Sequence, residues 1–242
     1  GDALFPAGVE DVGVFPLVGC HGQDDGLHAL EELLVHGGPL QVGGLDAGEH
    51  PGNIALGVGA RWIDGVFFNV LAVFVITYLV QYVDVPRTEA LTVVMIAALV
   101  MFLFAGRLAD RFGRGKVYGL ASLLCGLSIF PSFWLMEGSG GNLFLIGLAI
   151  VIPLSVFYAG VFGPEAALFS DLFPPDVRYT GISIVYQFPG FLVAGIVPGL
   201  CTLFMKWNDG DPLYVCLFTL LAGLTSAASA FIIQRKHNAA VR

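Results

Sequence analysis

Three ionisable side chains stand within stretches of the chain that are otherwise apolar: Arg61, Asp64 and Glu165. If these stretches cross a membrane, each charge costs ~2.5–3.5 kcal/mol on insertion scales and requires a partner or a function. Arg61 and Asp64 are three residues apart, so a helix places them on one face, with Asn69 nearby. The pair either lines a polar pathway for substrate or protons, or extends to water at the membrane surface. The spacing leaves both interpretations open.

Glu165 follows Pro164 directly. A proline removes one backbone donor and kinks or breaks a helix, and we expect the carboxyl group beside it to point inward. Glu165 is therefore a candidate proton carrier, and the alternative is a structural ion pair with Arg111 or Arg178. Further candidates for lining the same substrate or proton pathway are Tyr158, Tyr186 and Gln187.

The elements that must position these residues are membrane-spanning helices. Hydrophobic residues make up 56% of the 242 residues and charged residues 12%, against roughly 45–50% and 25% in soluble domains. A helix needs about 20 apolar residues to cross a bilayer, and six stretches qualify. We predict an all-α membrane protein with spans near Ile63–Tyr82, Glu89–Gly106, Val117–Met136, Leu143–Phe169, Gly181–Met205 and Leu213–Ile233.

The basic residues indicate the orientation of these spans. Eight of the eleven Lys and Arg lie after the second, fourth and sixth spans, including the basic tail at 234–242. The opposite loops hold Arg87 and Lys206 together with several acidic residues. Because cytoplasmic loops carry an excess of Lys and Arg, we predict a multi-pass protein of the inner (plasma) membrane with a cytoplasmic C-terminus.

A motif of glycines and charges joins the second and third predicted spans. It runs from Gly106 through Asp110, Arg111, Gly113 and Arg114. The glycines allow close backbone approach, Asp110 can accept charge-assisted hydrogen bonds, and the arginines can pair with carboxylates on neighbouring helices. Positive-inside bias explains the arginines but not the glycines and the aspartate at these offsets. The motif resembles the signature loop of the major facilitator superfamily and predicts a cytoplasmic gating role.

A second stretch, from Tyr158 to Gly181 with Tyr186 and Gln187 beyond it, resembles the metabolite:proton symporter branch of that superfamily. The resemblance covers about Asn53 to Ile233 and implies helices seven to twelve of a twelve-helix transporter, with helices one to six absent from this sequence. Two positions depart from the pattern. Glu165 stands where the branch usually has Gln, and Gly115 where the loop usually has a basic residue.

The resemblance also implies a cytoplasmic charge network. In the superfamily, a carboxylate placed like Asp171, an arginine placed like Arg178 and the loop residues Asp110 and Arg111 help to hold the outward-facing state. Such a network can act as a switch, because its charges pair when the cytoplasmic side closes and meet water when it opens. We expect neutralisation of Asp171 to destabilise one of the two states.

Residues 1–52 differ from the rest of the chain. They hold nine of the nineteen acidic residues, no Lys or Arg and no span, so we predict a disordered segment foreign to the family. His28, Glu32 and His36 have a spacing that could bind a metal, but a Gly-Gly pair follows His36 and no fourth ligand is evident. No metal site and no cofactor are predicted.

The predicted function is secondary active transport, with proton-coupled symport of a small carboxylate or zwitterion by alternating access as the leading hypothesis. The partners would be the substrate, protons, the lipid bilayer and the missing N-terminal six-helix half, with no nucleic acid. Alternatives are a truncated or misread half-transporter without activity of its own, and a sugar-type facilitator. An enzyme is not predicted, because no nucleophile motif or phosphate-binding loop is present.

Overall fold

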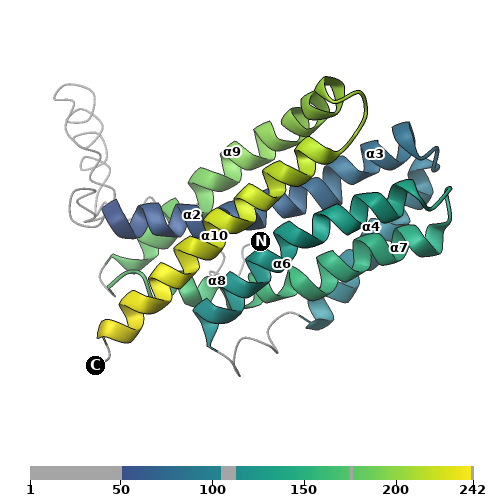
Figure 1. Ribbon diagram of the computed structural model, residues 1–242. Coiled ribbons are helices and arrows are strands. Elements are labelled where there is room, and N and C mark those ends of the chain that lie inside the picture. The colour runs from purple at the N-terminus through teal and green to yellow at the C-terminus, as the bar shows by residue number, and fades with distance from the viewer. Residues whose placement is uncertain (1–50, 105–112, 175–176, 241–242) are drawn as a thin grey trace, which may run out of the picture. The chain divides into compact units, whose positions relative to one another are not determined.

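The computed structural model describes residues 51–104, 113–174 and 177–240, and these residues are almost entirely helical (Figure 1). In chain order the elements are α2 (Pro51–Phe68), η1 (Asn69–Phe74), α3 (Val75–Tyr82), α4 (Arg87–Phe104), α6 (Arg114–Glu137), α7 (Leu143–Val151), η2 (Ile152–Phe157), α8 (Ala159–Ser170), α9 (Arg178–Trp207) and α10 (Leu213–Ala240).

Five helical runs among the described residues are long and apolar enough to cross a membrane: Pro51–Tyr82, Arg114–Glu137, Leu143–Ser170, Arg178–Trp207 and Leu213–Lys236. Each contains one predicted span or most of it. The remaining helix, α4, occupies the place of the predicted second span. The end of that span lies outside the described residues. The all-helical six-span prediction is therefore confirmed.

The first run begins earlier than predicted, at Pro51 instead of Ile63. The early part of α2 is rich in small residues, so hydropathy alone does not mark it, but Gly57 packs there closely. A Cβ on Gly57 would lie 2.5 Å from a methyl group of Val185 in α9. Arg61 and Asp64 consequently sit well inside a helix and not in its first turns.

Two of the runs contain a π-helical segment. In the run Pro51–Tyr82, η1 separates α2 from α3, and in the run Leu143–Ser170, η2 separates α7 from α8. The amide of Tyr158 bonds the carbonyl of Pro153 at 3.0 Å, five residues back, and Pro153 at the start of η2 has no amide to donate. Helix α8 continues through Pro164. Of the kink or break expected at Pro164, the break is absent, and the change in helix type falls at η2.

The helices pack through small residues and inserted side chains. Helix α10 lies against α6 and α2, α2 against α9, and α6 against α8 (Figure 1). Gly126 of α6 and Gly223 of α10 allow one of these approaches, since a Cβ on Gly223 would lie 2.7 Å from the carbonyl oxygen of Ser122. Lipid gives little hydrophobic drive for helix association, so close contact of this kind holds such bundles together.

The segment of α2 that carries Arg61 and Asp64 is held by two neighbouring helices. Ser226 of α10 donates a hydrogen bond to the carbonyl of Gly59 and accepts one from the amide of Ile63, both at 2.9 Å. Tyr118 of α6 donates to the carbonyl of Ala60 at 2.7 Å. These bonds fix the height and rotation of this turn, and therefore the direction of its charged side chains.

Candidate functional site

The structure brings Arg61, Asp64 and Glu165 into one cluster. Arg61 and Asp64 pair through Nη1 and Oδ2 within α2, and the same Nη1 lies 2.8 Å from Oε1 of Glu165 in α8. Asp64 is 5% exposed and Glu165 2%, whereas the side chain of Arg61 is 18% exposed. One guanidinium group thus forms ion pairs with two buried carboxylates, which come from two helices.

Asp64 has a second partner. The hydroxyl of Tyr158, the residue between η2 and α8, donates to Oδ1 of Asp64 at 2.6 Å. The Tyr158 ring also stacks on Phe67 with centroids 5.7 Å apart, so it has little freedom to leave. Both oxygens of Asp64 are engaged, one by Arg61 and one by Tyr158.

Arg61 is covered on one face by an aromatic ring. Its guanidinium carbon lies 4.6 Å from the centroid of the Tyr186 ring in α9, a separation at which a cation is attracted to the ring face. Tyr186 in turn meets Phe169 edge to face at 5.6 Å. The cluster therefore joins three helices, α2, α8 and α9.

Two polar atoms of the cluster are buried without an aligned hydrogen bond: Nε of Arg61 and Oε1 of Glu165. The contact between Arg61 and Glu165 is therefore a close ion pair with poor hydrogen-bond geometry. A buried polar atom that lacks a partner raises the energy of the arrangement, so this pair is easier to exchange than the pair of Asp64 with Tyr158.

Arg61 and Asp64 form a pair within α2 in which Asp64 is buried and the side chain of Arg61 is 18% exposed. The partner of Glu165 is Arg61 and not Arg178, whereas Arg111 lies outside the described residues. Asn69 bonds the carbonyl of Gly65 in its own helix at 2.9 Å, and Gln187 is exposed.

Two residues predicted for the gating loop and charge network, Arg114 and Asp171, meet where α6 begins and α8 ends. Nη1 of Arg114 lies 3.3 Å from Oδ2 of Asp171. Arg178 donates from Nε to the carbonyl of Phe173 at 3.2 Å. This bond holds the start of α9 close to the residues that follow α8. Gly106, Asp110 and Arg111 lie outside the described residues.

Gly113 and Gly115 play different parts at the start of α6, and Gly106 lies outside the described residues. Gly113 has φ +89°, a conformation that favours glycine, and among the described residues no atom lies within 4 Å of an added Cβ. Close approach belongs to Gly115. Its amide donates to Oε1 of Gln234 in α10 at 2.9 Å, and a Cβ there would lie 2.6 Å from the same oxygen.

The contact between Gly115 and Gln234 was not predicted. The sequence signals were that Gly115 stands where the loop usually has a basic residue and that Gln234 directly follows the last predicted span. Next to them, Asn53 bonds Lys236 of α10 at 3.3 Å and the carbonyl of Leu172 at 2.9 Å. The ends of α2, α6, α8 and α10 are thereby joined.

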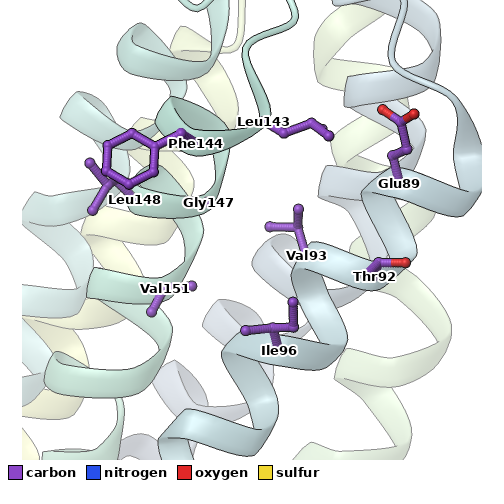
Figure 2. Close-up of a pocket in the computed structure, with 9 residues that line it drawn as sticks. All are labelled: Glu89, Thr92, Val93, Ile96, Leu143, Phe144, Gly147, Leu148 and Val151. Atoms are coloured by element: carbon purple, nitrogen blue, oxygen red, sulfur yellow. The ribbon is translucent and has the colours of Figure 1, made fainter.

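Grooves between helices of the described part of the chain are lined by other residues than those predicted for the site. One, of about 520 Å³, opens between α4 and α7, where Figure 2 shows Val93, Ile96, Phe144 and Leu148 along apolar walls with Glu89 near one end. Apolar walls of this kind suit lipid chains. Among the described residues no group of His, Cys, Asp and Glu could hold a metal ion.

Known proteins resemble this chain over most of its described part. Inner membrane metabolite transport protein YhjE of Escherichia coli (strain K12) is 32% identical over 177 residues, which cover 70% of this chain and 40% of that protein. The Shikimate transporter of the same organism is 25% identical, covering 78% of this chain and 44% of its own. The Citrate-proton symporter of Klebsiella pneumoniae is 24% identical, covering 69% and 38%. No solved structure matches.

The chain spans about two fifths of the length of these curated relatives. Residues 58–240 match the Major Facilitator Superfamily, and this range includes every described helix from the middle of α2 onward. The resemblance predicted from the sequence is confirmed: the chain is an integral membrane protein that belongs to the major facilitator superfamily and has the six-helix fold of one half of such a transporter.

Proposed function

We propose that the chain forms half of a secondary active transporter that carries a small carboxylate or zwitterion together with protons. The observation that carries this proposal is the buried cluster of Arg61, Asp64 and Glu165. Ionisable groups at membrane depth mark substrate and proton pathways. No enzyme-like arrangement accompanies the cluster among the described residues.

The charge balance of the cluster favours proton coupling. One guanidinium and two carboxylates leave one negative charge uncompensated, unless a carboxyl group holds a proton. A bare charge in a low-dielectric environment is costly, so gain and loss of a proton alter the energy of this cluster strongly. The names of two relatives support the same class, since one is a citrate-proton symporter and another a shikimate transporter.

Alternating access requires two bundles that rock about a site between them. We propose that the inner-membrane protein works with a second six-helix bundle and keeps its C-terminus in the cytoplasm. The pair of Arg114 with Asp171 would then lie on the cytoplasmic side and help to close it. The half on its own is expected to bind substrate but not to move it.

Uptake into proteoliposomes tests this function. The chain is reconstituted alone, and together with the N-terminal half of its relative YhjE, and uptake of labelled shikimate and citrate is followed with an inward proton gradient. Uptake is expected only in the second preparation and is expected to stop when a protonophore collapses the gradient. Uptake that ignores the gradient would exclude proton coupling, and no uptake in either preparation would contradict transport.

A further inference from the structure

We infer that Arg61 is the anchor for the carboxylate of the transported metabolite, and that Glu165 yields its place on the guanidinium to that carboxylate when it takes up a proton. This inference rests on the proposed function and deepens it. It assigns a separate role to each residue of the cluster: Glu165 carries the proton, Arg61 binds the substrate, and Asp64 keeps Arg61 in position.

Arg61 has the donors that a carboxylate needs. Both of its ion pairs use Nη1, whereas Nε is buried without a hydrogen bond among the described residues. A guanidinium offers five donors in a planar fork that matches a carboxylate, often through two parallel bonds. The ring of Tyr186 covers one face and so leaves the edge of the fork as the place for a ligand.

Glu165 is the carboxylate that can leave. Its Oε1 contacts Arg61 at 2.8 Å without an aligned hydrogen bond, and it comes from another helix, α8. Asp64 lies in the same helix as Arg61 and also accepts a bond from Tyr158. Separation of Arg61 from Glu165 therefore costs one ion pair between two helices, whereas removal of Asp64 costs an ion pair with Arg61 and a hydrogen bond from Tyr158.

The exchange balances in atoms and charge. A proton from water binds a carboxylate oxygen of Glu165, the ion pair with Arg61 ends, and the substrate carboxylate pairs with the guanidinium. The cluster and its ligand carry one net negative charge before and after, because one proton enters with one anion. A monocarboxylate would therefore bind with one proton, and its transport would move no net charge.

No other ionisable group that faces Glu165 in the described part of the chain can replace it as the group that takes up a proton and leaves Arg61. They are Arg61 and Asp64 from α2, Tyr118 from α6, Tyr158 from the start of α8, and Tyr186 from α9. Tyr118 and Tyr158 are held by hydrogen bonds to Ala60 and Asp64. Within the described part of the chain, the exchangeable partner of Arg61 is thus Glu165.

Equilibrium binding to the purified chain in detergent tests the inference. Shikimate, a monocarboxylate, and its uncharged methyl ester are titrated by calorimetry, and proton uptake is followed with a pH-indicator dye in weakly buffered solution. We expect about one proton per bound shikimate, and affinity for the ester at least about tenfold lower, a difference of about 1.4 kcal/mol. This comparison needs no variant, so misfolding cannot obscure it.

Two substitutions sharpen the test. Glu165→Gln is expected to retain shikimate binding and to lose the proton uptake. Arg61→Lys keeps the charge but not the fork, and is expected to weaken binding by about tenfold or more, whereas Arg235→Lys at an exposed position serves as the control. Equal affinities for acid and ester, proton uptake that persists in Glu165→Gln, or no binding of shikimate to the folded chain would overturn the inference.

Failure here differs from failure of the proposed function. Binding at equilibrium needs no gradient and no second bundle, so a chain that cannot transport can still pass. Conversely, proton-driven uptake in the reconstituted preparation that the methyl ester inhibits as well as shikimate does would support transport and refute the role of Arg61.

Discussion

The hydroxyl of Ser226 stands between two backbone groups of α2, accepting from the amide of Ile63 and donating to the carbonyl of Gly59, each at 2.9 Å. In a regular helix this amide and this carbonyl would bond each other. The Ser226 hydroxyl thus bonds both members of this pair, in the turn that carries Arg61.

Removal of this hydroxyl tests its importance. Ser226→Ala is expected to lower the free energy of unfolding by about 0.5–1.5 kcal/mol, because two hydrogen bonds to the backbone of α2 are lost. SDS-induced unfolding in mixed micelles measures the change. Ser183→Ala is the control, since Ser183 is half-buried and bonds the carbonyl of Tyr179 in its own helix. Equal effects of both substitutions would contradict the role of Ser226.

The ion pairs of Arg61 predict strong coupling between positions. Arg61→Gln leaves two buried carboxylates without a counter-charge and is expected to cost about 3–5 kcal/mol of unfolding free energy. Glu165→Gln in the same chain should recover part of that loss, because it removes one of the stranded charges. The double-mutant cycle is measured by the same unfolding assay. Strictly additive losses would show that the two side chains do not interact.

The contact of Gly223 with α6 predicts a steric limit. Gly223→Ala would place a methyl group 2.7 Å from the carbonyl of Ser122, and overpacking of this kind costs roughly 1–3 kcal/mol. Gly195→Ala is the matched control, since no atom lies within 4 Å of its Cβ, and its better helix propensity should stabilise by up to about 1 kcal/mol. If both variants unfold alike, the close packing of α6 on α10 is unimportant.

The pair of Arg114 with Asp171 predicts an effect on function without one on stability. Both side chains are partly exposed, at 51% and 29%, and such pairs contribute about 0–1 kcal/mol. Asp171→Asn should therefore unfold like the unmodified chain, yet change shikimate uptake in the preparation with the second bundle. It should also change the thiol reactivity of a cysteine introduced at Ser170.

Asp209→Asn provides the comparison for Asp171, because this residue is also exposed but lies in the loop between α9 and α10. Its uptake and thiol reactivity should stay at the level of the unmodified chain. Unchanged uptake and reactivity in Asp171→Asn would remove the proposed gating role.

The helices could be predicted because hydropathy and membrane thickness determine them. The start of α2 could not, since its residues before Arg61 are held by contacts such as that of Gly57 with Val185 and not by apolar composition. The partner of Glu165 was equally hidden, because an ion pair between α8 and α2 depends on how two distant segments pack. Gly115 departs from the motif, and its contact with Gln234 depends on how α6 packs against α10, which the sequence does not show.

The π-helical segments η1 and η2 change the rotation, about the helix axis, of the helix that follows relative to the helix that precedes. Each takes up more residues per turn than an α-helix does, so α2 can present its charges in one direction while α3 presents its packing face in another. An insertion or deletion of one residue in η1 or η2 would rotate everything beyond it by roughly 100°. The face that α8 turns toward the Arg61 cluster, and with it the position of Glu165, therefore depends on the length of η2 as much as on the residues in the cluster.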